Sequence, residues 1–261
     1  MMKKMLFRIL LSALGFCAII ALWQLAFHLV DNRTKLPSPF SVFEYIEDSL
    51  LSGVLVSAIK GTLMRMFSGY AMGLVFGIPL GVLCARVRIF RDTLGLLALG
   101  LQALPSVCWA IPAILWFGAN NAAMVFVVLM GSVWSLLLST QHGVMNISPI
   151  YIRAARTMGS KGLHTWIYVI MPAAFPSIVG GMKQGWAFAW RSLMAAEIVV
   201  ALPVSKANGL GLQLNYGNDN NDIAQVIGIM IVIVAIGLLV DKILFSPWEN
   251  MLRKRWGLDA K

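Results

Sequence analysis

Five charged residues lie inside long apolar stretches of the sequence, where a charge needs a partner or a purpose. They are Lys60, Arg65, Lys183, Arg191 and Glu197. A charged side chain at membrane depth costs at least ~2.5–3.5 kcal/mol, so it usually faces the protein interior or water. Cations there can bind an anionic solute, or they can pair with carbonyl groups and fasten one helix to another. Lys60 and Arg65 lie close to one end of their stretch, where long side chains can also reach the membrane surface.

Residues that could bind a metal or support catalysis are scattered along the chain. They comprise three cysteines and three histidines: Cys17, Cys84, Cys108, His28, His142 and His164. No cysteine has metal-ligand spacing, and no histidine has a carboxylate or cysteine at a useful separation. The sequence also contains no G-x-x-x-x-G-K-[ST] phosphate-binding loop. We therefore expect no catalytic residue, no metal and no cofactor in this chain.

The composition is that of a membrane protein. Of 261 residues, 59% are hydrophobic and only 12% are charged, and the mean hydropathy is +0.79. A soluble domain carries about a quarter charged residues, so lipid must solvate much of this chain. The net charge of +10 does not indicate a nucleic-acid partner, because the basic residues form no polar domain or stripe.

Six apolar segments are long enough to cross a bilayer, since about 20 residues span ~30 Å of hydrocarbon. The sequence predicts spanning helices over residues 5–30, 55–85, 93–117, 122–140, 173–202 and 223–245. The first exceeds the apolar run of about 7–15 residues in a signal peptide, so we interpret it as a retained span. The second has glycine at every fourth position from 69 to 81, a pattern that predicts close helix packing. The expected fold is an all-α membrane protein with one domain over residues 1–261.

Lysine and arginine residues are distributed unevenly between the segments that connect these spans. Fourteen lie on one side, and only Arg33, Lys35 and Lys206 lie on the other. Positively charged connections tend to stay in the cytoplasm. The asymmetry therefore predicts a multi-pass protein of the bacterial inner membrane with both chain ends inside.

Three connections on the predicted outer side carry local signals. Ser41 and Glu44 match a capping box, which predicts the start of a short amphipathic helix on the membrane surface; a solvated acidic loop is the alternative. Gly118–Asn121 predicts a tight turn between the third and fourth spans. Residues 203–222 are rich in glycine and asparagine, and predict a loop in which a Gly-Leu-Gly sequence marks a backbone turn.

The connection between the fourth and fifth spans, residues 148–172, carries the strongest functional signal. Ser148 and Pro149 mark a helix start, and Gly159 provides a left-handed turn at the helix end. Between them, small or apolar side chains fall on one helix face: Tyr151, Ala154, Ala155 and Met158. Such a face should be buried, either against its own bundle or in a groove on a partner.

This connection resembles the EAA motif of permease subunits of binding-protein-dependent ABC importers, EAA-x3-G-x9-I-x-L-P. Ala154 and Ala155 match the paired alanines, Gly159 the glycine and Pro172 the proline. Arg153 occupies the position of the glutamate, which reverses the charge there. The segments LPSP at 36–39, GTLMRMFSGY at 61–70, GIPLG at 77–81 and ILWFG at 114–118 resemble the nitrate, sulfonate, taurine and bicarbonate branch of the family.

The resemblance implies the fold of a type I ABC importer permease, in which residues 148–172 hold a cytoplasmic coupling helix. The residues expected to couple to an ATPase are Arg153, Ala154, Ala155, Met158, Gly159 and Pro172. The implied partners are two ABC ATPase subunits, a second permease subunit in a homodimer, and a periplasmic or lipid-anchored solute-binding protein. Membrane lipid surrounds the chain, and no nucleic acid is expected.

The branch also implies a small solute such as a sulfonate, nitrate or related oxyanion, with a heterocyclic vitamin precursor as the alternative. Candidates for lining its path are Lys183, Arg191, Glu197 and Arg65, and either Lys183 or Arg191 could make the path electropositive. These cations could instead pair with carbonyl groups or lock the fifth span to the second. A stand-alone channel or ion-coupled carrier would predict paired intramembrane acids or interrupted helices in matched halves, and Glu197 is the only candidate acid.

Overall fold

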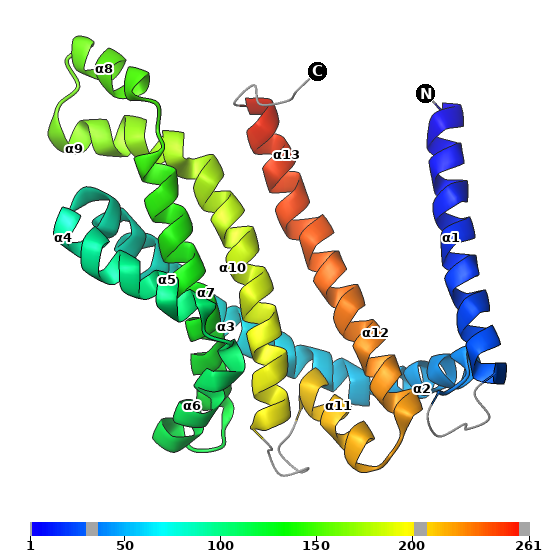
Figure 1. Cartoon of the computed structure of the whole chain (residues 1–261). Coiled ribbons are helices and arrows are strands. Elements are labelled where there is room, and N and C mark those ends of the chain that lie inside the picture. The colour runs from blue at the N-terminus through cyan, green and yellow to red at the C-terminus, as the bar shows by residue number, and fades with distance from the viewer. Residues whose placement is uncertain (1, 30–35, 201–207, 256–261) are drawn as a thin grey trace.

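The computed structural model describes residues 2–29, 36–200 and 208–255, and within these ranges every regular element is a helix. The predicted all-α fold is confirmed. The start of α1 (Met2–Leu29) and the end of α13 (Ser246–Arg255) lie at the same end of the molecule as the short helices α8 (Pro149–Thr157) and α9 (Gly162–Thr165) (Figure 1). An even number of membrane crossings requires this arrangement of the chain ends.

Four helical segments are long and apolar enough to cross a membrane: Val54–Arg86, Asn121–Met145, Gly162–Val199 and Ile223–Leu252. The first two are α3 and α7. In the third, α9 continues through a π-helical turn (Trp166–Ile170) into α10 (Met171–Val199). In the fourth, α12 (Ile223–Val240) continues through a second π-helical turn (Asp241–Phe245) into α13. The second, fourth, fifth and sixth predicted spans each lie on one of these segments, apart from residues 201–202, which lie outside the described residues.

The first predicted span corresponds to α1, in which the described apolar stretch is Cys17–Leu29. The cations that the topology argument counts on the outer side, Arg33, Lys35 and Lys206, lie outside the described residues.

The third predicted span is not one helix. A short helix α4 (Arg88–Phe90) and a π-helical turn lead into α5 (Leu96–Ala103), and a 3-10 turn after Pro105 leads into α6 (Ala110–Phe117). The two arms are bent by 103°. Pro105 lacks an N–H group and disfavours helical backbone at the preceding Leu104, which is extended at φ −67° and ψ 126°. The prediction of one continuous helix over residues 93–117 is therefore wrong.

The first outer connection forms the predicted helix, but with a different start. The helix α2 runs from Pro39 to Leu51, and the Ser38 side chain accepts a hydrogen bond from the Ser41 N–H group at 3.1 Å. The predicted capping box at Ser41 and Glu44 is wrong, because Ser38 followed by proline at the first helical position begins the helix earlier.

The other two outer connections differ in how well the sequence predicts them. The turn between α6 and α7 is confirmed: Gly118 has φ of 78°, and the Asn120 side chain caps α7. The predicted loop over residues 203–222 is wrong in its second half, because α11 (Leu210–Asp219) forms there. It lies beside α12, at the end of the molecule opposite α8 (Figure 1).

The centre of the bundle is α7, which packs on α3 along the predicted row of glycines. An added Cβ atom at Gly69 would lie 2.6 Å from the Cβ atom of Val128, and one at Gly77 would lie 2.8 Å from that of Leu136. Gly73 and Gly81 face Ser132 and Thr140 in the same way. The close helix packing that this glycine pattern predicts is confirmed. The helix α7 also packs closely on α10.

Candidate functional site

The predicted coupling segment forms α8, a nine-residue helix at the end of the molecule that carries both described chain ends. Ser148 precedes the helix as predicted, although its side chain makes no capping hydrogen bond. Gly159 has φ of 86°, in the left-handed region that glycine adopts without steric conflict. There the Ser160 N–H group donates to the Ala155 carbonyl at 2.9 Å, which closes the helix end.

The small and apolar face of α8 lines a groove of about 510 Å³. Tyr151, Ala154 and Met158 are exposed there, Met158 at 87%, and Ala155 is buried at its base. Within the described residues, α8 packs only on α9 and the turn that follows it. The bundle therefore leaves this face open. Arg153 is exposed on the same helix, and Pro172 lies in the first turn of α10.

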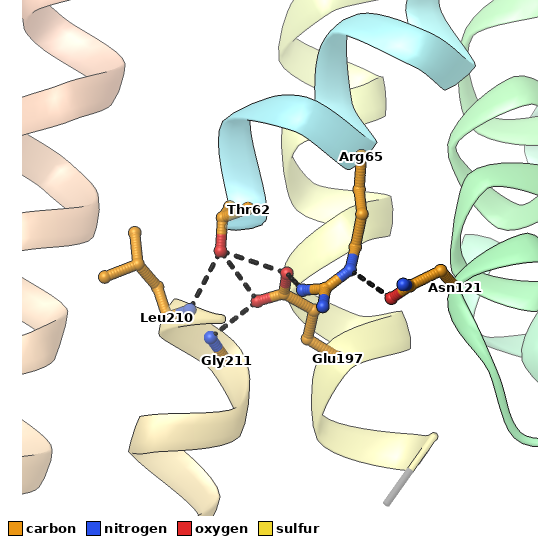
Figure 2. A network of polar contacts seen from close by, with 6 residues as sticks. All are labelled: Thr62, Arg65, Asn121, Glu197, Leu210 and Gly211. Carbon is orange, nitrogen blue, oxygen red and sulfur yellow. Dashed lines mark hydrogen bonds and ion pairs between the residues drawn. The ribbon is translucent and has the colours of Figure 1, made fainter. Parts of the chain in front are cut away.

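A buried ion pair joins two of the charged residues inside the spans (Figure 2). The Arg65 guanidinium of α3 donates to the Glu197 carboxylate of α10 at 2.8 Å, and the two side chains are 8% and 0% exposed. The Nε of Arg65 donates to the Asn121 side chain at the start of α7, also at 2.8 Å. Because both charges are enclosed, this pair fastens the outer parts of three helices together and does not face an open path.

Further hydrogen bonds tie α11 to the same carboxylate. The Gly211 N–H group donates to Glu197 Oε2 at 2.8 Å. The Thr62 hydroxyl donates to both carboxylate oxygens, at 3.0 and 3.1 Å, and accepts from the Leu210 N–H group at 2.8 Å. Figure 2 shows these donors converging from α3 and α11 on Glu197, which α10 carries. The first N–H groups of α11, which have no partner inside their own helix, are satisfied in this way.

The Gly-Leu-Gly sequence, interpreted above as a backbone turn, has a more specific role. An added Cβ atom at Gly209 would lie 2.7 Å from the Arg65 guanidinium, and one at Gly211 would lie 2.6 Å from the Cβ atom of Glu197. Glycine is needed here because the backbone touches the ion pair directly. One signal in the sequence could have indicated the pair: Arg65 and Glu197 are opposite charges near the same ends of two predicted spans.

Lys183, in the first half of α10, is neutralised by carboxylates from the π-helical turn after α12 and from α13. Its Nζ lies 2.9 Å from Asp241 Oδ1 and 3.7 Å from Glu249 Oε2. Sequence reasoning allowed a lock between the fifth span and the second. Lys183 instead joins the fifth span to the sixth, and Arg65 with Glu197 joins the fifth to the second.

Arg191 is the exception among the charged candidates inside α10. Its guanidinium is exposed, donates through Nε to the Ala187 carbonyl at 3.2 Å, and lies 4.9 Å from the centre of the Phe188 ring. Within the described ranges, no carboxylate oxygen lies within 4.0 Å of it. Arg191 therefore keeps an exposed positive charge that no carboxylate of the described residues compensates.

Comparisons with known proteins agree on one family. Residues 77–246 match the model of the binding-protein-dependent transport system inner membrane component. A protein of Methanocaldococcus jannaschii that is named as an ABC transporter permease is 30% identical over 96% of this chain and 95% of its own. A bicarbonate transport system permease protein of Synechococcus elongatus is 28% identical over 92% of this chain and 87% of its own. An inward-facing structure of the MetNI methionine ABC transporter shares the fold, with a TM-score of 0.64 and 19% identity, over 78% of this chain and 97% of the other.

Proposed function

The chain belongs to the family of binding-protein-dependent transport system inner membrane components, and we propose that it is the transmembrane permease subunit of an ATP-driven importer. It is a multi-pass protein of the inner membrane. Six spans with both ends in the cytoplasm, in one domain over residues 1–261, complete the proposal. The charge asymmetry of the connections supports this topology, as does the position of α8, α9 and the described chain ends at one end of the molecule.

The observation that carries the proposal is the open face of α8. In this proposal residues 148–172 form the coupling segment, and a groove on an ABC ATPase receives Ala154, Ala155 and Met158. Gly159 ends the helix, Pro172 begins the following span, and exposed Arg153 meets acidic groups on the partner. A small, uncovered helix face at a membrane surface supports docking, because burying it in a partner groove removes apolar area from water.

The family description names a binding protein as a partner, and we propose the other partners that the sequence resemblance implies. Two ATPase subunits supply the energy, a second copy of this chain completes a homodimer, and a binding protein outside the membrane delivers the solute. A stand-alone carrier is less well supported. The chain has one broken span within its described residues, and its candidate acid, Glu197, is enclosed by Arg65 and Thr62.

The proposed solute is a small oxyanion such as a sulfonate, nitrate or bicarbonate. The bicarbonate permease among the relatives supports this class, and so does the uncompensated charge of Arg191. Of the two cations considered for the path, Arg191 is favoured over Lys183, because Asp241 and Glu249 neutralise the latter. A heterocyclic vitamin precursor is the alternative, and it would have no need of that charge.

Replacing Ala154 with tryptophan tests the coupling segment. The bulky ring would fill the groove beside Met158, so we expect the amount of co-purifying ABC ATPase to fall on the order of ten-fold, as a central contact worth more than 1.4 kcal/mol implies. Because Ala154 is exposed, the variant should fold normally. The chain is co-expressed with the ATPase of its host, and the retained ATPase and its ATP hydrolysis are measured after purification.

The matched control is Ile150→Trp, which adds a similar ring to the same helix outside the groove. It should retain the ATPase. Equal retention by both variants would contradict the proposed coupling role, and solute transport by the purified chain without any ATPase would contradict the importer itself.

A further inference from the structure

A cavity of about 320 Å³ opens where the third predicted span is broken. Leu104 and Pro105 form one wall, and the middle of α7 and the outer half of α10 form the others. The polar side chains that line it are Gln102, Ser106, Trp134, Arg191 and Ser192. None of its lining residues is acidic. The sharp bend at Pro105 thus leaves a polar cavity beside α7 and α10, and Arg191 is the charged residue that lines it.

A second cavity, of about 420 Å³, continues from the first toward the end of the molecule that carries α8. The two cavities share Gln102. This second cavity is lined by polar side chains from both long helices: Ser135, Ser139 and His142 of α7, Asn146 directly after α7, and Ser177 and Gln184 of α10. It also has no acidic lining residue. Together the two cavities form one groove between α5, α7 and α10.

The spacing of these side chains shows that the groove follows one face of each helix. Positions 135, 139 and 142 of α7 repeat at helical spacing, and positions 177, 184 and 191 of α10 recur every seven residues. Polar residues inside a membrane bundle are costly and mark solute paths or helix contacts. Here they line cavities, which favours a path.

Two polar atoms of the groove residues are buried without a hydrogen-bond partner in the protein. They are Nε1 of Trp134 and Oγ of Ser135, two of the three such side-chain atoms in the described part of the chain. A buried donor left unpaired costs about 1–3 kcal/mol. The indole nitrogen can only donate a hydrogen bond, but it is buried and does not face a solute in the cavity.

Arg191 supplies the charge that an oxyanion would need. Its guanidinium presents several N–H donors in a planar fork that matches the oxygens of a carboxylate or a related oxyanion. The second cavity, which lies nearer to α8, is lined by hydroxyl, amide and imidazole groups but by no lysine or arginine. A path of neutral donors holds an anion weakly enough for it to leave.

We propose that this groove conducts a small oxyanion, with Arg191 as its outer binding residue and the polar faces of α7 and α10 as the way toward the cytoplasm. This inference rests on the importer function proposed above. It adds the groove that the proposed oxyanion would follow and the residues that would select it.

Cysteine labelling tests whether water and anions enter the groove. Exposed Cys17 and Cys108 are replaced by alanine, and buried Cys84 is kept. Ser106→Cys reports on the first cavity, which Arg191 lines, and Ser139→Cys reports on the second cavity. Both thiols should react with methanethiosulfonate reagents in membrane vesicles. The control is Met72→Cys, which is exposed on α3 outside the groove. Like Ser139, Met72 lies 18 positions after the start of its helix. Its thiol should react at least about ten-fold more slowly, because only a hydrated thiol ionises readily.

The selection of anions is read from two reagents of opposite charge. At Ser106→Cys, we compare the reaction rate of the anionic reagent ethylsulfonate methanethiosulfonate with that of its cationic trimethylammonium analogue. The ratio of the anionic rate to the cationic rate should be on the order of ten-fold higher than the same ratio measured for a small thiol in water. Adding Arg191→Gln should remove this preference, and Arg191→Lys should keep part of it. Lys60→Gln removes a cation that does not line the groove, and it should leave the ratio unchanged.

An unreactive Ser139→Cys, or a preference that survives Arg191→Gln, would overturn the inference. Either result with normal co-purification of the ATPase would reject the groove and leave the importer function standing. Full retention of the ATPase partner by Ala154→Trp, with charge selection intact, would reject the coupling role alone.

Discussion

Replacing Glu197 with alanine is expected to lower the free energy of unfolding by about 3–5 kcal/mol. The change would leave the Arg65 guanidinium enclosed without its counter-charge, and it would remove the acceptor of the Gly211 N–H group and of the Thr62 hydroxyl. Most of that penalty comes from desolvation of the remaining charge. Denaturant unfolding of the purified chain in mild detergent, followed by tryptophan fluorescence, measures it.

Two further variants separate the ion pair from a general loss of packing. The double variant Glu197→Gln with Arg65→Met removes both charges at similar volume, so it should be more stable than Glu197→Ala alone. Asp92→Ala is the control, because Asp92 is an exposed acid whose Oδ2 lies 3.4 Å from Nε of Arg88. Its removal should change the free energy of unfolding by less than about 1 kcal/mol. A Glu197→Ala variant as stable as the parent would contradict the buried network.

The network also explains why α11 exists as a helix. Its N-terminal N–H groups donate to Glu197 and Thr62, and its two glycines let the backbone approach the ion pair. We therefore expect Glu197→Ala to expose α11 to proteolysis before the long helices unfold, since its start would lose the side chains that hold it.

Replacing Gly77 with leucine should prevent α3 and α7 from packing, with a loss of at least about 3 kcal/mol and little folded protein. An added Cβ atom would lie 2.8 Å from both the Cβ atom of Leu136 and the backbone oxygen of Val133. A backbone atom cannot move aside as a flexible side chain can. Yield of monodisperse protein by size-exclusion chromatography measures the effect.

The matched control is Gly100→Ala in α5. An added Cβ atom there meets no atom within 4 Å, so this variant should fold with a yield close to that of the parent. Equal yields for the Gly77 and Gly100 variants would contradict the role of the glycine row in helix packing.

Much of the architecture is predictable because it depends on local or periodic features. Membrane crossings follow from runs of apolar residues, since the bilayer sets their length. The glycine row between positions 69 and 81 indicates close packing by its period alone. The ends of α8 follow from Ser148, Pro149 and Gly159, whose backbone preferences act over a few residues. The break at Pro105 was also open to prediction, because proline disfavours helix at the residue before it.

The sequence by itself determined the composition, the length and the period of the helices, and the small face of α8. Only the tertiary structure decided which charges meet: Arg65 and Glu197 are 132 positions apart, and their contact depends on how α3, α7 and α10 pack. It likewise decided that residues 210–219 form a helix and that Arg191 keeps an unpaired charge above a polar groove. These features arise from contacts between distant segments. The spacing of residues along one helix specifies which of them share a face, but not what that face will touch.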